Sequence, residues 1–94
     1  MLDYNQFEQE LKTVRDFIRF AMSEFERHEL YFGHGTNSSF DEALALVTYI
    51  IACPYEHLEF VLDSRLCVFE KKKVFELLKK RVNERIPLPY LTKQ

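Results

Sequence analysis

The sequence predicts an all-α protein, a small bundle of about four helices followed by an extended C-terminal tail. The 94 residues include only two glycines and three prolines, too few for the many turns of an all-β fold. Apolar residues recur every three or four positions along most of the chain. Hydrophobic residues make up 47% and charged residues 30% of the chain, a balance typical of a packed globule. At this length we expect one core.

The first predicted element is a long helix from about Asp3 to Glu29. Apolar residues at alternating spacings of four and three form a stripe along one face of it: Phe7, Leu11, Val14, Ile18, Ala21 and Phe25. Phe17 and Phe20 widen this stripe. We therefore expect later elements to pack on this helix from two sides.

Both glycines of the chain, Gly33 and Gly35, come directly after this helix. Each destabilises helix continuation by about 1 kcal/mol and readily adopts positive φ, so the helix should end there. Ser39 and Glu42 then form the pattern of a capping box, which predicts that a second helix begins at Ser39. Its apolar residues nearly surround it, so we expect it to be the central buried helix, ending at Pro54.

The remaining elements are a short helix within Tyr55 to Leu66 and a last helix from about Phe69 to Arg85. The last helix should turn Val74, Leu77, Leu78 and Val82 inward and its basic residues toward water: Lys71, Lys72, Lys73, Lys79, Lys80 and Arg81. The prolines of the tail favour an extended chain. We divide the sequence into a helical domain, residues 1–86, and a linker, residues 87–94.

Charge is distributed unevenly along the chain. The formal net charge is −2, which argues against general nucleic-acid binding. Up to Ser64 there are twelve acids and four bases, a balance of −8, and from Arg65 onward three acids and nine bases, a balance of +6. No apolar run reaches the roughly 18–20 residues that a membrane span needs, and the N-terminus is too polar for a signal peptide. We expect a cytoplasmic protein without a membrane partner.

The residues alone do not assemble a reaction. Cys53 and Cys67 have no zinc or disulfide pattern around them, and we expect both to be buried thiols. The histidines do not match a metal-site spacing either. The segment Gly33-His34-Gly35 is interpreted as a tight connection between helices, with anion binding by its free amides as the alternative. The composition and periodicity therefore favour a binding or scaffolding domain.

Two stretches resemble one enzyme family. The segment Tyr31-Phe32-Gly33-His34-Gly35-Thr36-Asn37, followed by Phe40-Asp41-Glu42-Ala43, resembles the aromatic-Gly-His-Gly-Thr segment of the ribosomal-protein N5-glutamine methyltransferases, the PrmB group. The stretch Arg81 to Thr92 resembles the Arg-Ile-Pro-x-x-Tyr-Leu-Thr junction that this group shares with the release-factor glutamine methyltransferases. Together they cover about a third of the chain. Ser38-Ser39-Phe40 departs from the proline and tryptophan of the family pattern.

The resemblance implies a parent enzyme with two domains. In it, a helical N-terminal domain recognises a basic ribosomal protein, protein three of the large subunit, and a Rossmann-like domain binds S-adenosylmethionine. The family's Asn-Pro-Pro-Tyr catalytic loop has no counterpart in this sequence. No catalytic, cofactor-binding or metal-binding residue is therefore carried over. We expect this chain alone to be inactive and to bind no cofactor, with residues 87–94 leading toward the absent catalytic domain.

The resemblance suggests where contacts are made. The candidate residues for contact with the substrate or with the catalytic domain are Tyr31, Gly33, His34, Gly35, Thr36, Arg85, Pro87, Tyr90, Leu91 and Thr92. Two alternatives to substrate recognition remain. The basic last helix would contact rRNA or a ribosomal assembly particle, or the domain would only stabilise the catalytic half.

Overall fold

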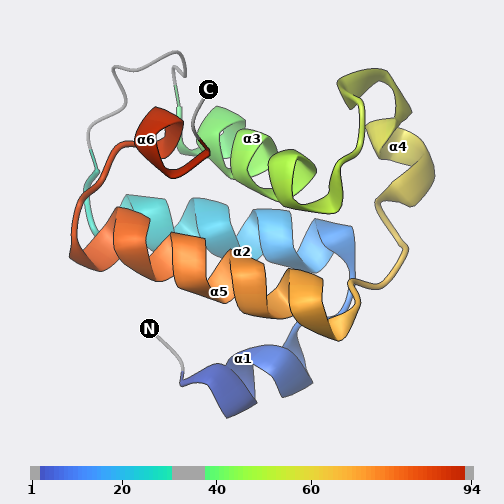
Figure 1. The fold of residues 1–94 in the computed structure, drawn as a ribbon, viewed down its shortest axis with the longest axis horizontal. Coiled ribbons are helices and arrows are strands. Elements are labelled where there is room, and N and C mark those ends of the chain that lie inside the picture. Colours follow the sequence, from blue (N-terminus) through green and yellow to red (C-terminus); the bar gives the residue numbers. More distant parts are fainter. Residues whose placement is uncertain (1–2, 31–37, 93–94) are drawn as a thin grey trace.

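The computed structural model describes residues 3–30 and 38–92 (Figure 1). In chain order the elements are α1 (Tyr4–Glu10), α2 (Val14–Arg27), α3 (Ser39–Ile51), the 3-10 turn η1 (Tyr55–His57), α4 (Leu58–Val61), α5 (Val68–Asn83) and α6 (Leu88–Thr92). Within these described ranges there is no strand, only an isolated antiparallel bridge between Thr13 and Arg65. The predicted all-α bundle is confirmed.

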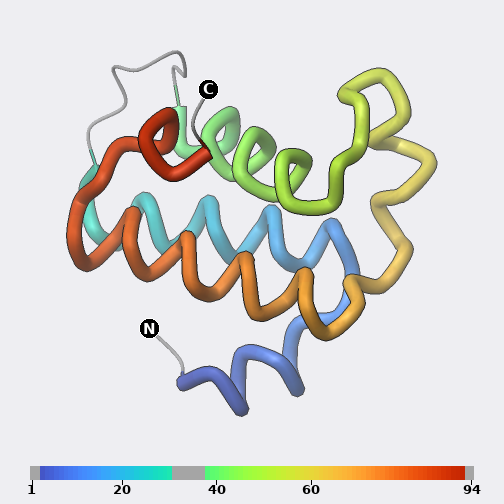
Figure 2. Tube along the Cα trace, viewed as in Figure 1, coloured from blue at the N-terminus to red at the C-terminus, as the bar shows by residue number. Residues whose placement is uncertain are grey.

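Helices α2 and α5 lie side by side and form the centre of the fold (Figures 1 and 2). Helix α3 packs on both of them from one side, and α1 packs on α5 from the other. Helix α6 lies against α3 and α5 at one end of the bundle, while α4 lies at the opposite end. Helix α2 is thus covered from two sides, as its wide apolar face predicted.

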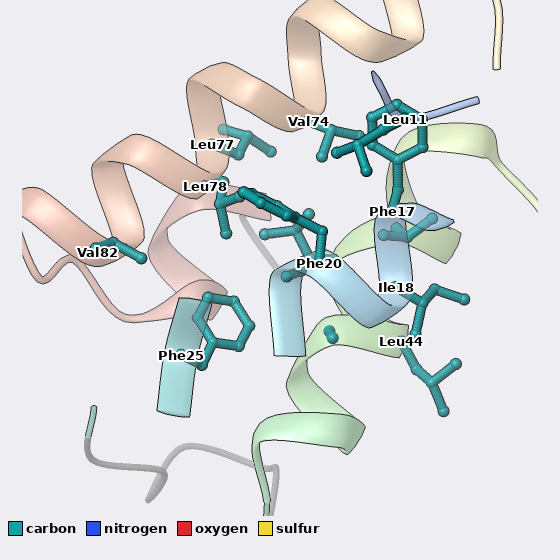
Figure 3. Packing of buried hydrophobic residues seen from close by; sticks show 14 of the residues in the cluster. Leu11, Phe17, Ile18, Phe20, Phe25, Leu44, Val74, Leu77, Leu78 and Val82 are labelled. Atoms are coloured by element: carbon teal, nitrogen blue, oxygen red, sulfur yellow. The ribbon is translucent and has the colours of Figure 1, made fainter. Parts of the chain in front are cut away.

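The core lies between these helices. Figure 3 shows Phe17, Phe20 and Phe25 of α2 facing Val74, Leu78 and Val82 of α5. The four residues predicted to face inward on α5 are all buried: Val74, Leu77, Leu78 and Val82. Phe7 of α1 joins the same core, with its ring centroid 5.3 Å from that of Phe17 and 5.0 Å from that of Phe75. Such edge-to-face pairs stabilise a core beyond their buried area.

The predicted single helix from Asp3 to Glu29 is wrong, because the chain breaks into two helices at Leu11 to Thr13. Thr13 caps α2: its hydroxyl accepts a hydrogen bond from the Asp16 amide at 3.2 Å, and Asp16 Oδ2 accepts one from the Thr13 amide at 2.9 Å. The extended backbone of the break pairs with the connection before α5, where Val14 N donates to Ser64 O at 3.0 Å. This reciprocal capping box outweighs the continuous apolar stripe.

Two further predictions are wrong, that both cysteines are buried and that the tail is extended. Cys67 is exposed: it is the N-cap of α5, and its amide donates to Glu70 Oε1 at 2.9 Å. Cys53 is only half-buried. The tail is not extended, since Leu88 to Thr92 form α6. Leu88 is buried against the core. Because the predicted first helix is two helices, α1 and α2, and the tail forms α6, the bundle has more helices than the four expected.

Candidate interaction site at one end of the bundle

The candidate site is the end of the bundle where α2 ends, α3 begins, and α5 leads into α6 (Figure 1). A buried ion pair holds this end together. Glu42, in the first turn of α3, accepts a hydrogen bond at 2.5 Å from Nε of Arg81, in the last turn of α5, and a second at 3.4 Å from Nη2. The two side chains are only 4% and 5% exposed. The predictions that Glu42 belongs to a capping box and that Arg81 faces water are therefore wrong.

The start of α3 is fixed by two serines. Ser38 is the N-cap, one residue earlier than predicted, and its hydroxyl accepts a hydrogen bond from the Asp41 amide at 3.1 Å. Ser39 is the first helical residue and its hydroxyl donates to Glu26 Oε2 of α2 at 2.5 Å. The capping role of one serine thus leaves the other free to tie α3 to the end of α2.

Arg85 connects the end of α5 to the end of α2. Its Nη2 donates to the carbonyl oxygens of His28 at 3.2 Å and Glu29 at 3.4 Å. These carbonyls lie just past the C-terminus of α2, where a cation is favourable because of the helix dipole. Arg85 and Glu29 both have positive φ, 55° and 49°, in the left-handed region that non-glycine residues seldom adopt. Arg85 is thus a predicted site residue whose side chain has a defined contact, with the end of α2.

The other predicted site residues on the C-terminal segment differ in exposure. Pro87 is half-buried and precedes α6, whose first turn closes with a hydrogen bond from Tyr90 N to Pro87 O at 3.1 Å. Tyr90 is 71% exposed, whereas Leu91 packs partly on the core and Thr92 is buried. Of these four, Tyr90 has the side chain most open to a partner. Tyr31, Gly33, His34, Gly35 and Thr36 lie outside the described residues.

The sequence reasoning missed a buried acid at this end. Glu24 of α2 is 3% exposed, and its Oε2 accepts a hydrogen bond from Arg27 Nη1 at 2.6 Å. Its Oε1 lies 3.7 Å from His28 Nε2 and makes no hydrogen bond. A glutamate inside the apolar stripe, next to Phe25, was the signal in the sequence. Its partners, three and four residues later, lie on the same helix face.

An apolar groove of about 410 Å³ lies on the side of the bundle where α2, α3 and α4 meet. It is lined by Ile18, Met22, Phe40, Leu44, Leu58 and Leu62, with Arg15 and Arg19 of α2 at its edge. Phe40 is 49% exposed. The sequence did not indicate this groove, because its walls come from three separate segments, α2, α3 and the α4 region, which only the fold brings together.

No three His, Cys, Asp or Glu side chains in the described part of the chain lie close enough together to hold a metal ion. No single described helix is long and apolar enough to cross a membrane; α3 and Tyr55–Val61 pass only as a pair, and the pair is bent by 92°. At the candidate site, the exposed Tyr90 lies on a helix that the buried Leu88 and Thr92 hold against the bundle.

Comparison with known proteins shows similarity to one kind of enzyme. The chain is 43% identical over 91 residues to the ribosomal protein uL3 glutamine methyltransferase of Neisseria gonorrhoeae, 43% over 83 residues to that of Burkholderia pseudomallei, and 40% over 88 residues to that of Bordetella pertussis. These matches cover 97%, 88% and 94% of this chain. The resemblance indicated by the sequence motifs is confirmed.

The similarity extends over only part of those enzymes. The chain spans 30%, 27% and 30% of the length of the three relatives. No family model matches the chain. No solved structure matches it.

Proposed function

We propose that this chain, a homologue of the ribosomal protein uL3 glutamine methyltransferases along nearly its whole length, is the substrate-recognition domain of such an enzyme. The parent enzyme would transfer a methyl group from S-adenosylmethionine to the side-chain amide of a uL3 glutamine. The similarity at 40–43% identity supports this function. A chain that spans 27–30% of its relatives fits one domain of a longer enzyme.

The single observation that carries the recognition role is the meeting of the two family-like segments. Glu42 comes from the first segment and Arg81 from the second, and they form the buried ion pair that joins α3 to α5. Arg85, also in the second segment, binds the end of α2 next to the first. Stretches far apart in the sequence thus build one end of the bundle, which is the surface we assign to the substrate.

The described residues do not fit a site for S-adenosylmethionine. Sites for such cofactors follow a strand with a glycine-rich turn that opens a helix. The described ranges have no strand, and their only β-type pairing is the bridge between Thr13 and Arg65. We therefore place the cofactor and the methyl transfer in the rest of the parent enzyme and derive no catalytic step from this chain.

Electrostatics favour a basic partner at this end. Ribosomal proteins are rich in lysine and arginine because they bind RNA. The chain up to Ser64 has a balance of −8, and at this end the exposed acids Glu26, Glu29 and Glu84 outnumber the exposed bases Arg27 and Arg85. Exposed charges of opposite sign speed up encounter and favour one orientation, and their effect falls with salt. Recognition by this surface should therefore be strongest at low ionic strength.

The test is binding of this 94-residue chain to purified, unassembled uL3, measured by isothermal titration calorimetry at low and high salt. We expect the double charge reversal Glu29→Lys with Glu84→Lys to weaken binding about tenfold at low salt. Glu56→Lys with Glu59→Lys is the matched control, because it makes the same charge change near α4, at the opposite end (Figure 1). That control should stay within about twofold of the wild type.

Two results would contradict the proposal. One is an affinity that does not depend on salt, and the other is an equal loss in both double variants. If the domain only stabilises the catalytic half, the reversal at Glu29 and Glu84 in the parent enzyme would leave kcat/KM for uL3 unchanged. Removal of the whole domain would then lower only the melting temperature.

A further inference from the structure

The outer face of α5 has a feature that recognition of a basic protein does not explain. Six basic residues between Lys71 and Arg81 were predicted to face water. For two of them this prediction is wrong. Arg81 is buried with Glu42, and Lys71 is half-buried, with its Nζ 3.4 Å from the carbonyl oxygen of Glu8. Of the other four, Lys80 is half-buried and its Nζ lies 3.9 Å from Glu76 Oε1, whereas Lys72, Lys73 and Lys79 are exposed. The positive charge of this helix is thus concentrated on one outer stripe.

An aromatic ring lies at the beginning of this stripe. Phe69 is 70% exposed. Phe60 in α4 is more exposed, at 91%, but acidic residues, Glu59 and Asp63, lie near it in the sequence, whereas Phe69 precedes a run of lysines. Lys72 and Lys73 follow it by three and four positions, so they lie next to it on the helix surface. Neither lysine has an ion pair within the described parts of the chain. Together with Lys79 these residues form the α5 stripe.

The α5 stripe has a length suited to a nucleic-acid strand. Lys72 and Lys79 are two turns apart, about 10 Å along the helix. In a duplex one strand carries one charge per about 3.4 Å of helix axis, and an unpaired strand is more extended, so this distance faces about two phosphates. Glu76 lies on the same face, but its Oε1 is 3.9 Å from Lys80 Nζ, so its charge is balanced within the helix.

We propose that the α5 stripe binds single-stranded RNA, with Lys72, Lys73 and Lys79 at the phosphates and Phe69 stacked on a base. Lysines alone would fit any anionic surface. An exposed planar ring beside them favours a partner with flat bases, because every base has a face on which an aromatic side chain stacks. This inference goes beyond the proposed function, since RNA binding by α5 does not require that uL3 is the substrate.

The test uses this chain and a fluorescein-labelled twelve-nucleotide oligouridine, followed by fluorescence anisotropy between about 20 and 200 mM salt. Lys72→Ala with Lys73→Ala should weaken binding and reduce the slope of log affinity against log salt by about 1.4, because each lost phosphate contact removes about 0.7. Phe69→Ala should weaken binding about tenfold and leave the slope unchanged, because stacking releases no counterions.

The matched control is Arg15→Ala with Arg19→Ala, which removes the same charge from the exposed side of α2. It should leave the affinity and the slope close to wild type. Three results would overturn the proposal: no binding at the lowest salt, an equal loss in the two double variants, or no effect of Phe69→Ala. Binding to phosphatidylserine vesicles that depends on the lysines, while oligouridine does not bind, would identify a lipid surface instead.

Discussion

At the scale of single residues, Asp16 shows how one carboxylate decides where a helix begins. Its Oδ2 accepts hydrogen bonds from the amides of Thr13 and Lys12, both at 2.9 Å. The hydrogen bond from the Thr13 amide is the main reason why the pKa of Asp16 lies below its usual value, and burial opposes it. Since these bonds favour the charged carboxylate, the capping box is strongest when Asp16 is ionised.

Asp16→Asn should therefore lower the free energy of unfolding by about 1 kcal/mol at pH 7. A pKa that is lower in the folded state gives stability above the unfolded value, near 3.9, that is lost as the pH falls through the folded value. The difference between wild type and variant should therefore shrink progressively once the pH falls below about 3.9. Urea unfolding followed by circular dichroism at pH 7 and pH 3 measures both quantities.

Asp63→Asn is the control for this prediction. Asp63 pairs with Arg15 at 3.3 Å, but the two side chains are 83% and 62% exposed. Such surface pairs contribute little, so this variant should change the stability by less than about 0.5 kcal/mol at either pH. A loss for Asp16→Asn that stays constant down to pH 3 would mean that the charge of Asp16 is not what stabilises the cap.

The buried pair Glu42–Arg81 should behave differently, because replacing one member keeps the other charge buried and removes their mutual attraction. Glu42→Leu and Arg81→Met should each lower the free energy of unfolding by about 3 kcal/mol, and the double variant by much less than the sum. A double-mutant cycle from urea unfolding measures this coupling. Additive losses would show that the two side chains do not stabilise the fold as a pair.

Some of these contacts between residues can be predicted from the sequence and others cannot. The spacing of Thr13 and Asp16 is that of a cap, but the prediction of one helix was based on the apolar stripe alone, which runs across it. The Glu42–Arg81 pair was not readable, because its members are 39 positions apart and only the packing of α3 on α5 brings them together. Local hydrogen bonds follow from spacing, whereas buried pairs follow from tertiary structure.

At the scale of elements, the long predicted helix shows why periodicity alone misplaced a boundary. The spacing from Phe7 through Leu11 and Val14 to Ile18 is helical, although the chain breaks between the second and third of these residues. All four residues are buried, since α1 and α2 both turn their apolar side to the same core. The helical spacing of apolar residues therefore continues across the break, because all four face one core, whereas the break itself is set by the capping box at Thr13.

In the C-terminal segment the error is the reverse: an extended chain was predicted where the structure has a helix. Pro87 and Pro89 suggested an extended chain, but proline is well tolerated in the first turn of a helix, where the missing amide would have no partner. Leu88 gains burial when α6 forms, and Thr92 Oγ1 donates to Leu88 O at 3.3 Å. A helix of five residues is not stable alone, so its packing on α3 and α5 must maintain it.

Leu88→Ala should therefore detach α6 and lower the free energy of unfolding by about 2 kcal/mol. Faster exchange of the α6 amides, measured by hydrogen-exchange mass spectrometry, should accompany the loss. Tyr90→Ala is the control on the same helix, because Tyr90 is 71% exposed and should cost less than about 0.5 kcal/mol. Equal losses for the two variants would mean that Leu88 does not anchor α6.

At the scale of the whole molecule, the charge asymmetry of the sequence became a division of surfaces. The basic last third supplies α5, whose exposed lysines form the α5 stripe, while exposed Glu29 lies at the end of α2. The fold class and most of the core followed from periodicity. The arrangement of these surfaces did not, because the crossing of α3 over α2 and α5 is set by side-chain packing and not by any one segment.

Phe7 is the residue through which α1 belongs to the same cooperative unit. It is fully buried, and its ring contacts those of Phe17, Phe20 and Phe75 with centroids 5.3, 5.7 and 5.0 Å away. The backbone between α1 and α2 is broken, so these rings and not a continuous helix connect α1 to the core. Unfolding should therefore involve α1 and the rest of the bundle together.

Phe7→Ala should lower the free energy of unfolding by about 3–5 kcal/mol, a large part of the 5–15 kcal/mol typical of small domains. Urea unfolding followed by far-ultraviolet circular dichroism and by tyrosine fluorescence should give one midpoint in the wild type. Gln9→Ala, an exposed change on the same helix, should leave that midpoint unchanged. A loss below about 1 kcal/mol for Phe7→Ala, with α1 amides exchanging freely while α2 and α5 stay protected, would show that α1 is a separate appendage.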